Sequence, residues 1–283
     1  AFGCMSLGEN SDVNAYLLHA AHDGGVTLFD TADLYQHGWN EECVGNAFRD
    51  RRERVVLATK VGNQWRPDGS GWDWNPTKAY ILGAVEGSLR RLRTDYIDLY
   101  QLHGGTLDDP LDETIEAFEV LRQQGKIRAY GLSSIRPNVI REWVRRGSDL
   151  ASVMIQYGLL DRRPEEFCLQ FLHGNGISVL ARGSLAKGLL AGKPGAEYLT
   201  YSETDVRQVV KVLANCAAGL RSPTAMALRY ALHPPVVAAA VVGIRTQEHL
   251  SDALRAAETP ALTAKEWSTL AQVLPPNCYD QHR

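Results

Sequence analysis

The sequence has few cysteines and no long hydrophobic run. Five cysteines that are odd in number and widely spaced predict neither a disulfide framework nor a CxxC metal or redox pair. The longest clear apolar run, residues 236–242, is far shorter than the roughly 20 residues that span a membrane. No basic segment followed by an apolar one opens the chain, so we expect a cytoplasmic protein without a signal peptide.

Strong charge of one sign is also missing. The formal net charge is −3, which gives no reason to expect nucleic acid as a partner, and nothing predicts a membrane partner or a bound metal. An apolar fraction of 45% and a charged fraction of 22% are typical of an ordinary globular protein. The chain opens at Ala1 without methionine and runs directly into a strand pattern, so we expect residues upstream in the natural protein.

Eight short β-rich runs alternate with longer helical patterns. Most of the runs are apolar throughout, as expected of strands that are covered on both faces. They are residues 2–7, 27–31, 55–60, 96–103, 127–133, 152–157, 177–181 and 236–243. Parallel strands need crossover connections, so this alternation predicts a parallel sheet.

Helix start and stop signals separate these runs. Proline follows a capping residue before residues 77–93 and before residues 111–124, and Gly125 is suited to end the second of these helices. Residues 205–220 predict an extra helix before the one that starts near Pro223, and helices are also expected at 249–257 and 264–273. An open doubly wound sheet competes with a closed barrel. The count of eight and the absence of a linker favour an α/β fold with one (β/α)₈ TIM barrel domain over residues 1–283.

Polar residues gather where these strands end. In a (β/α)₈ barrel the chemistry lies at the carboxyl ends of the strands, and Asp30, Tyr35, Lys60 and His103 all fall there. Taken singly, each residue also fits a purely structural role, such as a helix cap, a solvated surface charge or a hydrogen-bonded core residue. Together, an ammonium that lowers a tyrosine pKa, an aspartate that orients it and a histidine that donates to a carbonyl suit protonation of an oxygen.

The chain resembles the aldo-keto reductase superfamily over nearly its whole length. The segments that carry the resemblance are FDTADLY at 29–35, ATK at 58–60, DYIDLYQLH at 95–103, GKIRAYGLS at 125–133 and VGIRT at 242–246. The family's N-terminal hairpin has no counterpart in these residues. The resemblance implies that Tyr35 is the general acid, Lys60 its pKa-lowering neighbour, Asp30 the partner of Lys60, and His103 the donor that orients the carbonyl.

The resemblance also implies a nicotinamide cofactor bound without a Rossmann glycine fingerprint. The implied cofactor-binding residues are Ser133, Ser134, Gln156, Arg182, Gly183, Ser184, Leu185, Lys187, Gly243, Ile244, Arg245, His249 and Asp252. Three of these depart from the family pattern, because Ser134 replaces an asparagine, Arg182 an aromatic ring and His249 a glutamine. Arg245 is available for a 2′-phosphate, which favours NADPH over NADH.

The expected activity is the reduction of an aldehyde or ketone to an alcohol, with a small-molecule carbonyl substrate. A nucleotide-sensing regulatory subunit, resembling the potassium-channel beta subunits, is the alternative. A barrel hydrolase with two carboxylates is a third interpretation, but it leaves Lys60 and Tyr35 unexplained. Trp65, Trp72 and Trp74 either wall an apolar substrate site or pack their loop against the barrel.

Overall fold

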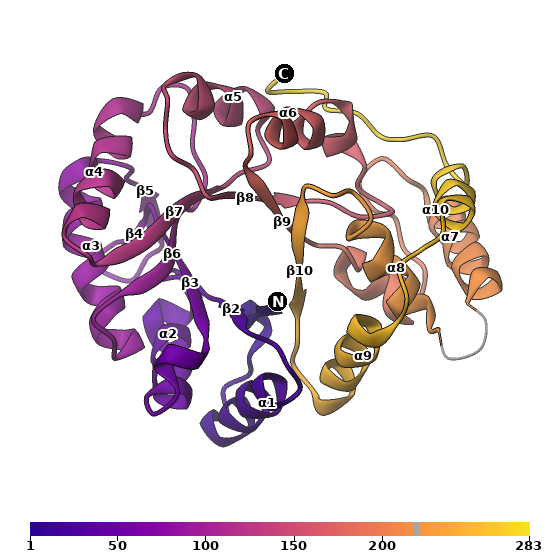
Figure 1. Ribbon diagram of the computed structural model, residues 1–283, viewed down its shortest axis with the longest axis horizontal. Coiled ribbons are helices and arrows are strands. Elements are labelled where there is room, and N and C mark those ends of the chain that lie inside the picture. The colour runs from indigo at the N-terminus through magenta and orange to yellow at the C-terminus, as the bar shows by residue number, and fades with distance from the viewer. Residues whose placement is uncertain (218–220) are drawn as a thin grey trace. The chain divides into compact units, whose positions relative to one another are not determined.

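The computed structural model describes residues 1–217 and 221–283. Eight parallel strands follow one another in the closed order β1-β10-β9-β8-β7-β6-β3-β2, with helices in the connections (Figure 1). The expected (β/α)₈ barrel is therefore confirmed. The strands are β1 (Phe2–Gly3), β2 (Leu28–Asp30), β3 (Val56–Val61), β6 (Ile97–Leu102), β7 (Ile127–Ser133), β8 (Ser152–Gln156), β9 (Ser178–Arg182) and β10 (Val237–Gly243).

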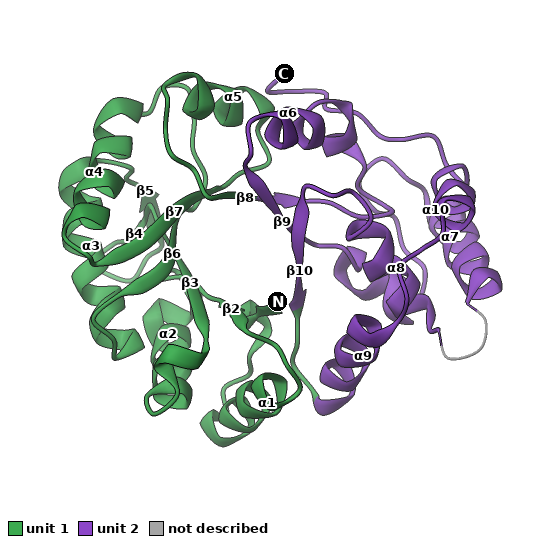
Figure 2. Ribbon diagram, in the orientation of Figure 1, with its two compact units in different colours: residues 1–153, 243–246 green, residues 154–242, 247–283 purple. Residues whose placement is uncertain are grey.

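The chain divides into two compact units, which Figure 2 colours separately. Unit 1 consists of Ala1–Val153 with Gly243–Thr246, and unit 2 of Met154–Val242 with Gln247–Arg283. The helices of unit 1 are α1 (Ser11–Asp23), α2 (Trp39–Phe48), α3 (Lys78–Leu92), α4 (Leu111–Gln123) and α5 (Pro137–Arg145). Those of unit 2 are α6 (Cys168–Gly174), α7 (Glu203–Cys216), α8 (Pro223–Ala231), α9 (Gln247–Glu258) and α10 (Ala264–Ala271). No helix in residues 1–217 and 221–283 is both long and apolar enough to cross a membrane.

The strand register in unit 1 sets which side chains can meet. Asp30 of β2 pairs with Ala58 of β3, and Lys60 of β3 pairs with Gln101 of β6. All of β6 and nearly all of β3 are buried, as expected of strands that are covered on both faces, and the buried residues include the polar Lys60 and Gln101. Because the strands are parallel, their carboxyl ends bring the residues that follow them to one edge of the sheet.

Two helices agree closely with their sequence signals. The extra helix is present as α7, where Ser202 and Asp205 form a reciprocal capping box. The predicted end of this helix included residues 218–220, which lie outside the described residues. The C-terminal helix α10 begins with a second capping box, between Thr263 and Glu266. Gly125 follows Gln124, the C-cap residue of α4, with a φ of 73°, which an L side chain rarely adopts.

Two elements differ from the sequence prediction. The first strand ends at Gly3 because Cys4–Ser6 turn into a 3₁₀ helix. A two-stranded antiparallel hairpin, β4 (Asn63–Trp65) and β5 (Trp72–Trp74), follows β3 in a stretch that the sequence pattern assigned to a loop. The hairpin places all three tryptophans of this stretch on paired strands.

Two helical glycines in unit 1 are expected to respond oppositely to alanine. A Cβ on Gly45 of α2 would lie 2.4 Å from the Arg91 carbonyl oxygen and 2.6 Å from Leu92 Cα, so Gly45→Ala forces α2 away from α3. We expect it to lower the free energy of unfolding by about 1–3 kcal/mol. A Cβ on Gly83 of α3 would meet nothing within 4 Å, so Gly83→Ala should raise the free energy of unfolding by up to about 1 kcal/mol. Urea unfolding of both variants measures these changes, and a Gly45→Ala variant as stable as the native protein would contradict the packing of α2 on α3.

Candidate active site

Four polar side chains of unit 1 meet at the carboxyl ends of three neighbouring strands. Asp30 is the last residue of β2, Lys60 lies near the end of β3, and His103 directly follows β6. Tyr35 opens the short 3₁₀ segment Tyr35–Gly38 that leads into α2. Figure 1 shows β2, β3 and β6 side by side, so short connections suffice to bring these residues together.

Lys60 lies at the centre of the group and is 1% exposed. Its Nζ donates to Asp30 Oδ2 at 2.7 Å and to the carbonyl oxygen of Thr31 at 2.7 Å. Burial by itself would lower the pKa of Lys60, but the charge and hydrogen bond of Asp30, with those of Tyr35, raise it above its ordinary value. The side chain is therefore held as an ammonium at neutral pH.

Tyr35 presents its hydroxyl to this ammonium. Lys60 Nζ lies 3.4 Å from Tyr35 Oη and 5.1 Å from the centre of the ring. The rings of Tyr35 and His103 meet edge to face, with their centroids 5.8 Å apart. One phenol thus has a buried cation on one side and an imidazole on another, which is the set of groups that proton transfer to an oxygen requires.

Two contacts around Asp30 and Lys60 were not foreseen from the sequence. Gln101 Nε2 donates to Asp30 Oδ1 at 3.3 Å, so both carboxylate oxygens of Asp30 are engaged. The Thr31 carbonyl oxygen is the second acceptor of Lys60. The sequence did contain one indication that Gln101 belongs to the site. It stands two residues before His103, and side chains two residues apart on a strand point to the same face.

A second cluster of buried polar residues surrounds Glu41. Glu41 is fully buried, and its carboxylate accepts from the Thr59 hydroxyl at 2.6 Å and from Arg91 Nε at 2.7 Å. Asp33 is 8% exposed, and its Oδ1 has no hydrogen-bond partner among the described residues. Burial first, and then the nearby charge of Glu41, raise the pKa of Asp33 to about 8.

Asp33 is expected to make stability fall as the pH rises. Because its pKa is higher in the folded chain than in the unfolded chain, the folded state binds more protons between about pH 4 and pH 8, and stability is lost through that window. Between about pH 6 and pH 9 the free energy of unfolding of the native protein should fall because Asp33 ionises. In Asp33→Asn this fall should be smaller by roughly 1–3 kcal/mol. Urea unfolding at both pH values measures it, with the exposed Asp108→Asn as control. Equal slopes in the native protein and Asp33→Asn would refute it.

The expected cofactor residues of unit 1 lie on two segments. Ser133 ends β7 and is followed by Ser134, and both are buried, with Ser134 Oγ accepting from the Arg136 backbone N–H at 3.2 Å. Gly243 ends β10, where an added Cβ would lie 2.6 Å from Ser6 Oγ. Ile244 is buried, whereas Arg245 is exposed and makes no ion pair with the described residues. An exposed guanidinium of this kind is available to an anionic ligand.

The expected cofactor residues of unit 2 lie at the ends of β8 and β9, in the segment that follows β9, and on α9. Arg182 donates to Gln156 Oε1 at 2.9 Å, and Gln156 Nε2 donates to the Tyr198 hydroxyl at 3.2 Å. Arg182 and Gln156 thus hold each other. Leu185 precedes the Ala186–Ala191 turn, where the exposed Lys187 has a left-handed backbone. The others are Gly183, with a φ of 71°, Ser184, which donates to the Tyr157 carbonyl at 3.0 Å, and His249 and Asp252 on α9.

The tryptophans of the β4–β5 hairpin have different environments. Trp74 Nε1 donates to Asp109 Oδ1 at 2.9 Å, and the Trp74 ring lies so close to Gly62 that an added Cβ would meet it at 2.6 Å. Trp65 stacks on His37, with ring centroids 3.7 Å apart. Trp72 is 47% exposed. Packing therefore accounts for Trp74 and Trp65, while Trp72 is the member of the set that is open to a ligand.

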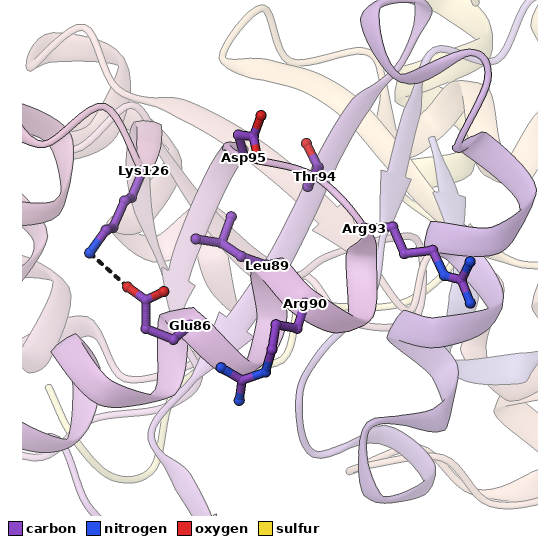
Figure 3. Close-up of a pocket in the computed structure, with 7 residues that line it drawn as sticks. All are labelled: Glu86, Leu89, Arg90, Arg93, Thr94, Asp95 and Lys126. Carbon is purple, nitrogen blue, oxygen red and sulfur yellow. Dashed lines mark ion pairs between the residues drawn. The ribbon is translucent and has the colours of Figure 1, made fainter.

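A surface hollow of about 480 Å³ in unit 1 lies away from these catalytic candidates (Figure 3). It is formed by the end of α3 and by residues that precede β6 and β7, which places it at the amino ends of the strands. Lys126 pairs with Glu86 at 2.6 Å, and the figure shows Arg90 and Arg93 pointing away from each other. The hollow therefore gathers no converging chemical groups.

Comparison with known proteins agrees with this geometry. The model of the aldo/keto reductase family matches residues 1–275. The chain belongs to the aldo/keto reductase family. It is 47% identical to the uncharacterized oxidoreductase YqkF of Bacillus subtilis, covering 99% of this chain and 94% of that protein. The holo form of the aldo-keto reductase AKR11C1 from Bacillus halodurans is 46% identical and superimposes with a TM-score of 0.94, covering 100% of this chain and 94% of that one.

Another similar structure is that of an aldo/keto reductase in complex with NADP. The Klebsiella pneumoniae enzyme in complex with NADP and acetate is 29% identical, with a TM-score of 0.82 over 100% of this chain and 93% of that one. As an aldo/keto reductase, the chain is an oxidoreductase. No group of histidine, cysteine, aspartate and glutamate side chains in residues 1–217 and 221–283 is arranged to hold a metal ion.

Proposed function

We propose that this aldo/keto reductase reduces an aldehyde or ketone to an alcohol with NADPH, and that Tyr35 donates the proton. The observation that carries the proposal is the position of the buried Lys60 ammonium, 2.7 Å from Asp30 Oδ2 and 3.4 Å from Tyr35 Oη. Burying an ion pair of this kind costs desolvation free energy, which the attraction between the two charges and their further hydrogen bonds must offset. The tyrosine hydroxyl beside this ion pair lies at the carboxyl ends of the strands, where barrel enzymes carry their chemistry, and this position supports a role in proton transfer.

Each of the four residues has a distinct task. Tyr35 gives its hydroxyl proton to the carbonyl oxygen of the substrate as that oxygen gains electron density. Lys60 stabilises the phenolate that is left, because a positive charge close to Tyr35 Oη favours the ionised form. Asp30 keeps Lys60 charged and fixed in place, and His103 donates a hydrogen bond that orients the same carbonyl oxygen.

The residues expected to hold NADPH fit such a ligand. Arg245 is an exposed cation without an ion pair among the described residues, as a 2′-phosphate contact requires. The small residues Ser133 and Ser134 lie at the end of β7, where the side chains of a barrel strand reach its catalytic end. NADPH, when bound, supplies the hydride that the carbonyl carbon accepts. The NADP complex of the Klebsiella pneumoniae relative supports the choice of cofactor.

The first experiment follows NADPH oxidation by the native protein with a panel of aldehydes and ketones. Steady consumption that depends on the carbonyl supports the reductase proposal and begins to define the substrate. Tight NADPH binding without turnover on any carbonyl would overturn it and favour the nucleotide-sensing alternative.

Arg245→Ala tests the cofactor preference. Loss of one charged hydrogen-bond donor to a 2′-phosphate is expected to weaken NADPH binding roughly tenfold and to leave NADH binding unchanged. Quenching of protein fluorescence by each nucleotide measures both dissociation constants. Arg90→Ala, which changes an arginine of the hollow in Figure 3, is the control and should alter neither. An equal loss of affinity for NADPH and NADH in Arg245→Ala would contradict a 2′-phosphate contact.

A further inference from the structure

The backbone turns left-handed immediately after Tyr35. Gln36 has φ 50° and ψ 40°, His37 has φ 55° and ψ 35°, and Gly38 has φ 88°. Two successive non-glycine residues in this region are unfavourable for L-amino acids and persist only where the surroundings impose them. The turn therefore needs contacts that hold it, and those contacts also fix where the Tyr35 side chain begins.

Asn40 provides the most central of these contacts and is fully buried. Its Nδ2 donates to the Cys4 carbonyl oxygen at 2.9 Å and to Gln36 Oε1 at 3.0 Å. Its Oδ1 accepts from the Thr31 hydroxyl at 2.7 Å. The orientation of the amide is fixed by chemistry, because a backbone carbonyl can only accept and so requires the NH₂ group of Asn40 to face Cys4.

The partners of Asn40 lie on both sides of the proposed proton donor. Gln36 is the residue directly after Tyr35, and Thr31 lies four residues before Tyr35. The Thr31 carbonyl oxygen is also the acceptor of Lys60 Nζ at 2.7 Å. One buried amide is therefore hydrogen-bonded to the side chain of the residue that follows the phenol and to the side chain of the residue whose carbonyl oxygen holds the ammonium.

We infer that Asn40 is a positioning residue for the proposed reaction: through Gln36 and Thr31 it sets the alignment of the Tyr35 hydroxyl with Lys60 and the substrate. This inference rests on the reductase function proposed above. Asn40 does not contact the reacting atoms and acts only through its neighbours. Its loss should reduce the rate of proton delivery while leaving cofactor binding in place, since a small displacement of a catalytic group costs far more in rate than in binding.

Asn40→Ala is expected to lower kcat about 10- to 100-fold and to leave the NADPH dissociation constant within about twofold. The solvent deuterium isotope effect on kcat should rise, because proton transfer from a misaligned Tyr35 becomes slower than the other steps. Asn14→Ala is the matched control. Asn14 is also a buried asparagine, but its Nδ2 donates to the Gly8 carbonyl oxygen at 2.9 Å and to Cys43 Sγ at 3.9 Å, and neither partner belongs to residues 35–38. It should lose stability without losing kcat.

A second variant keeps the inference testable if Asn40→Ala folds poorly. Gln36→Met replaces the amide of an exposed side chain by a thioether of similar length and so removes the acceptor of Asn40 Nδ2; it should fold and still lower kcat severalfold. The double variant should be no slower than Asn40→Ala alone, because both changes break one link. Losses that multiply in the double variant, or an unchanged kcat in Asn40→Ala, would overturn the inference.

Hydrogen exchange separates this inference from the proposed function. Backbone amides of residues 31–40 should exchange faster in Asn40→Ala than in the native chain or Asn14→Ala. If the native protein reduces no carbonyl, the reductase proposal fails, and faster exchange then shows only that Asn40 holds the turn. If the native protein is active and exchange in residues 31–40 is unchanged in Asn40→Ala, the positioning role fails alone.

Discussion

Tyr35→Phe is expected to lower kcat about 100- to 10,000-fold, the usual contribution of a positioned general acid. The substitution removes one oxygen atom, the only group on this ring that can donate a proton to the substrate. The dissociation constant of NADPH should stay within about threefold, because the ring itself remains against His103. Stopped-flow measurement of NADPH oxidation, with fluorescence titration of binding, gives both quantities.

Tyr80→Phe is the matched control for this experiment. Tyr80 is a half-buried tyrosine of α3 whose hydroxyl donates to the Asn63 carbonyl at 3.4 Å, away from Lys60. It should keep kcat within about threefold. A Tyr35→Phe variant as active as Tyr80→Phe would assign proton donation to another group.

Lys60→Met is expected to reduce both activity and stability. Removal of the ammonium leaves the buried Asp30 carboxylate without its charge partner, which should lower the free energy of unfolding by about 3–5 kcal/mol. It also removes the cation beside Tyr35 Oη, so kcat should fall at least about 100-fold. Urea unfolding and NADPH oxidation measure the two effects.

The double variant Lys60→Met with Asp30→Asn separates these effects. With the buried charge neutralised, most of the lost stability should return, since a neutral amide is cheaper to bury than an unpaired carboxylate. The activity should stay low, because Tyr35 still lacks its ammonium neighbour. Recovery of activity together with stability would show that Lys60 supports the fold and not the chemistry.

The barrel was predictable because its strands carry a strong pattern. Runs such as β10, which contains only alanine, valine and glycine, read as continuous apolar stretches, and eight such runs leave few arrangements other than a closed barrel. The β4–β5 hairpin was missed because each of its strands has only 3 residues, which is too short for an alternating pattern to indicate a strand. Its pairing depends on contacts such as Trp74 with Asp109, which local sequence does not encode.

The part of the candidate site that lies at the strand ends could be predicted from the sequence. Asp30, Lys60 and His103 could be placed at one edge from the strand pattern, and their roles came from the family resemblance. The hydrogen bonds of Asn40 and Gln101 were not foreseen, because they join residues that lie far apart in the sequence, Asn40 to Cys4 and Gln101 to Asp30. A buried side-chain network becomes visible only when the fold brings such segments together.

The most direct test of the central claim follows a label through the reaction. NADPH that carries deuterium at the hydride position of its nicotinamide is mixed with the native protein and an aldehyde that supports turnover, and the alcohol is analysed by mass spectrometry and NMR. Carbonyl reduction predicts deuterium on the carbinol carbon, with none entering that carbon from D₂O when unlabelled NADPH is used. Carbinol deuterium that comes from D₂O, or an alcohol formed without the label, would contradict hydride transfer to the carbonyl carbon.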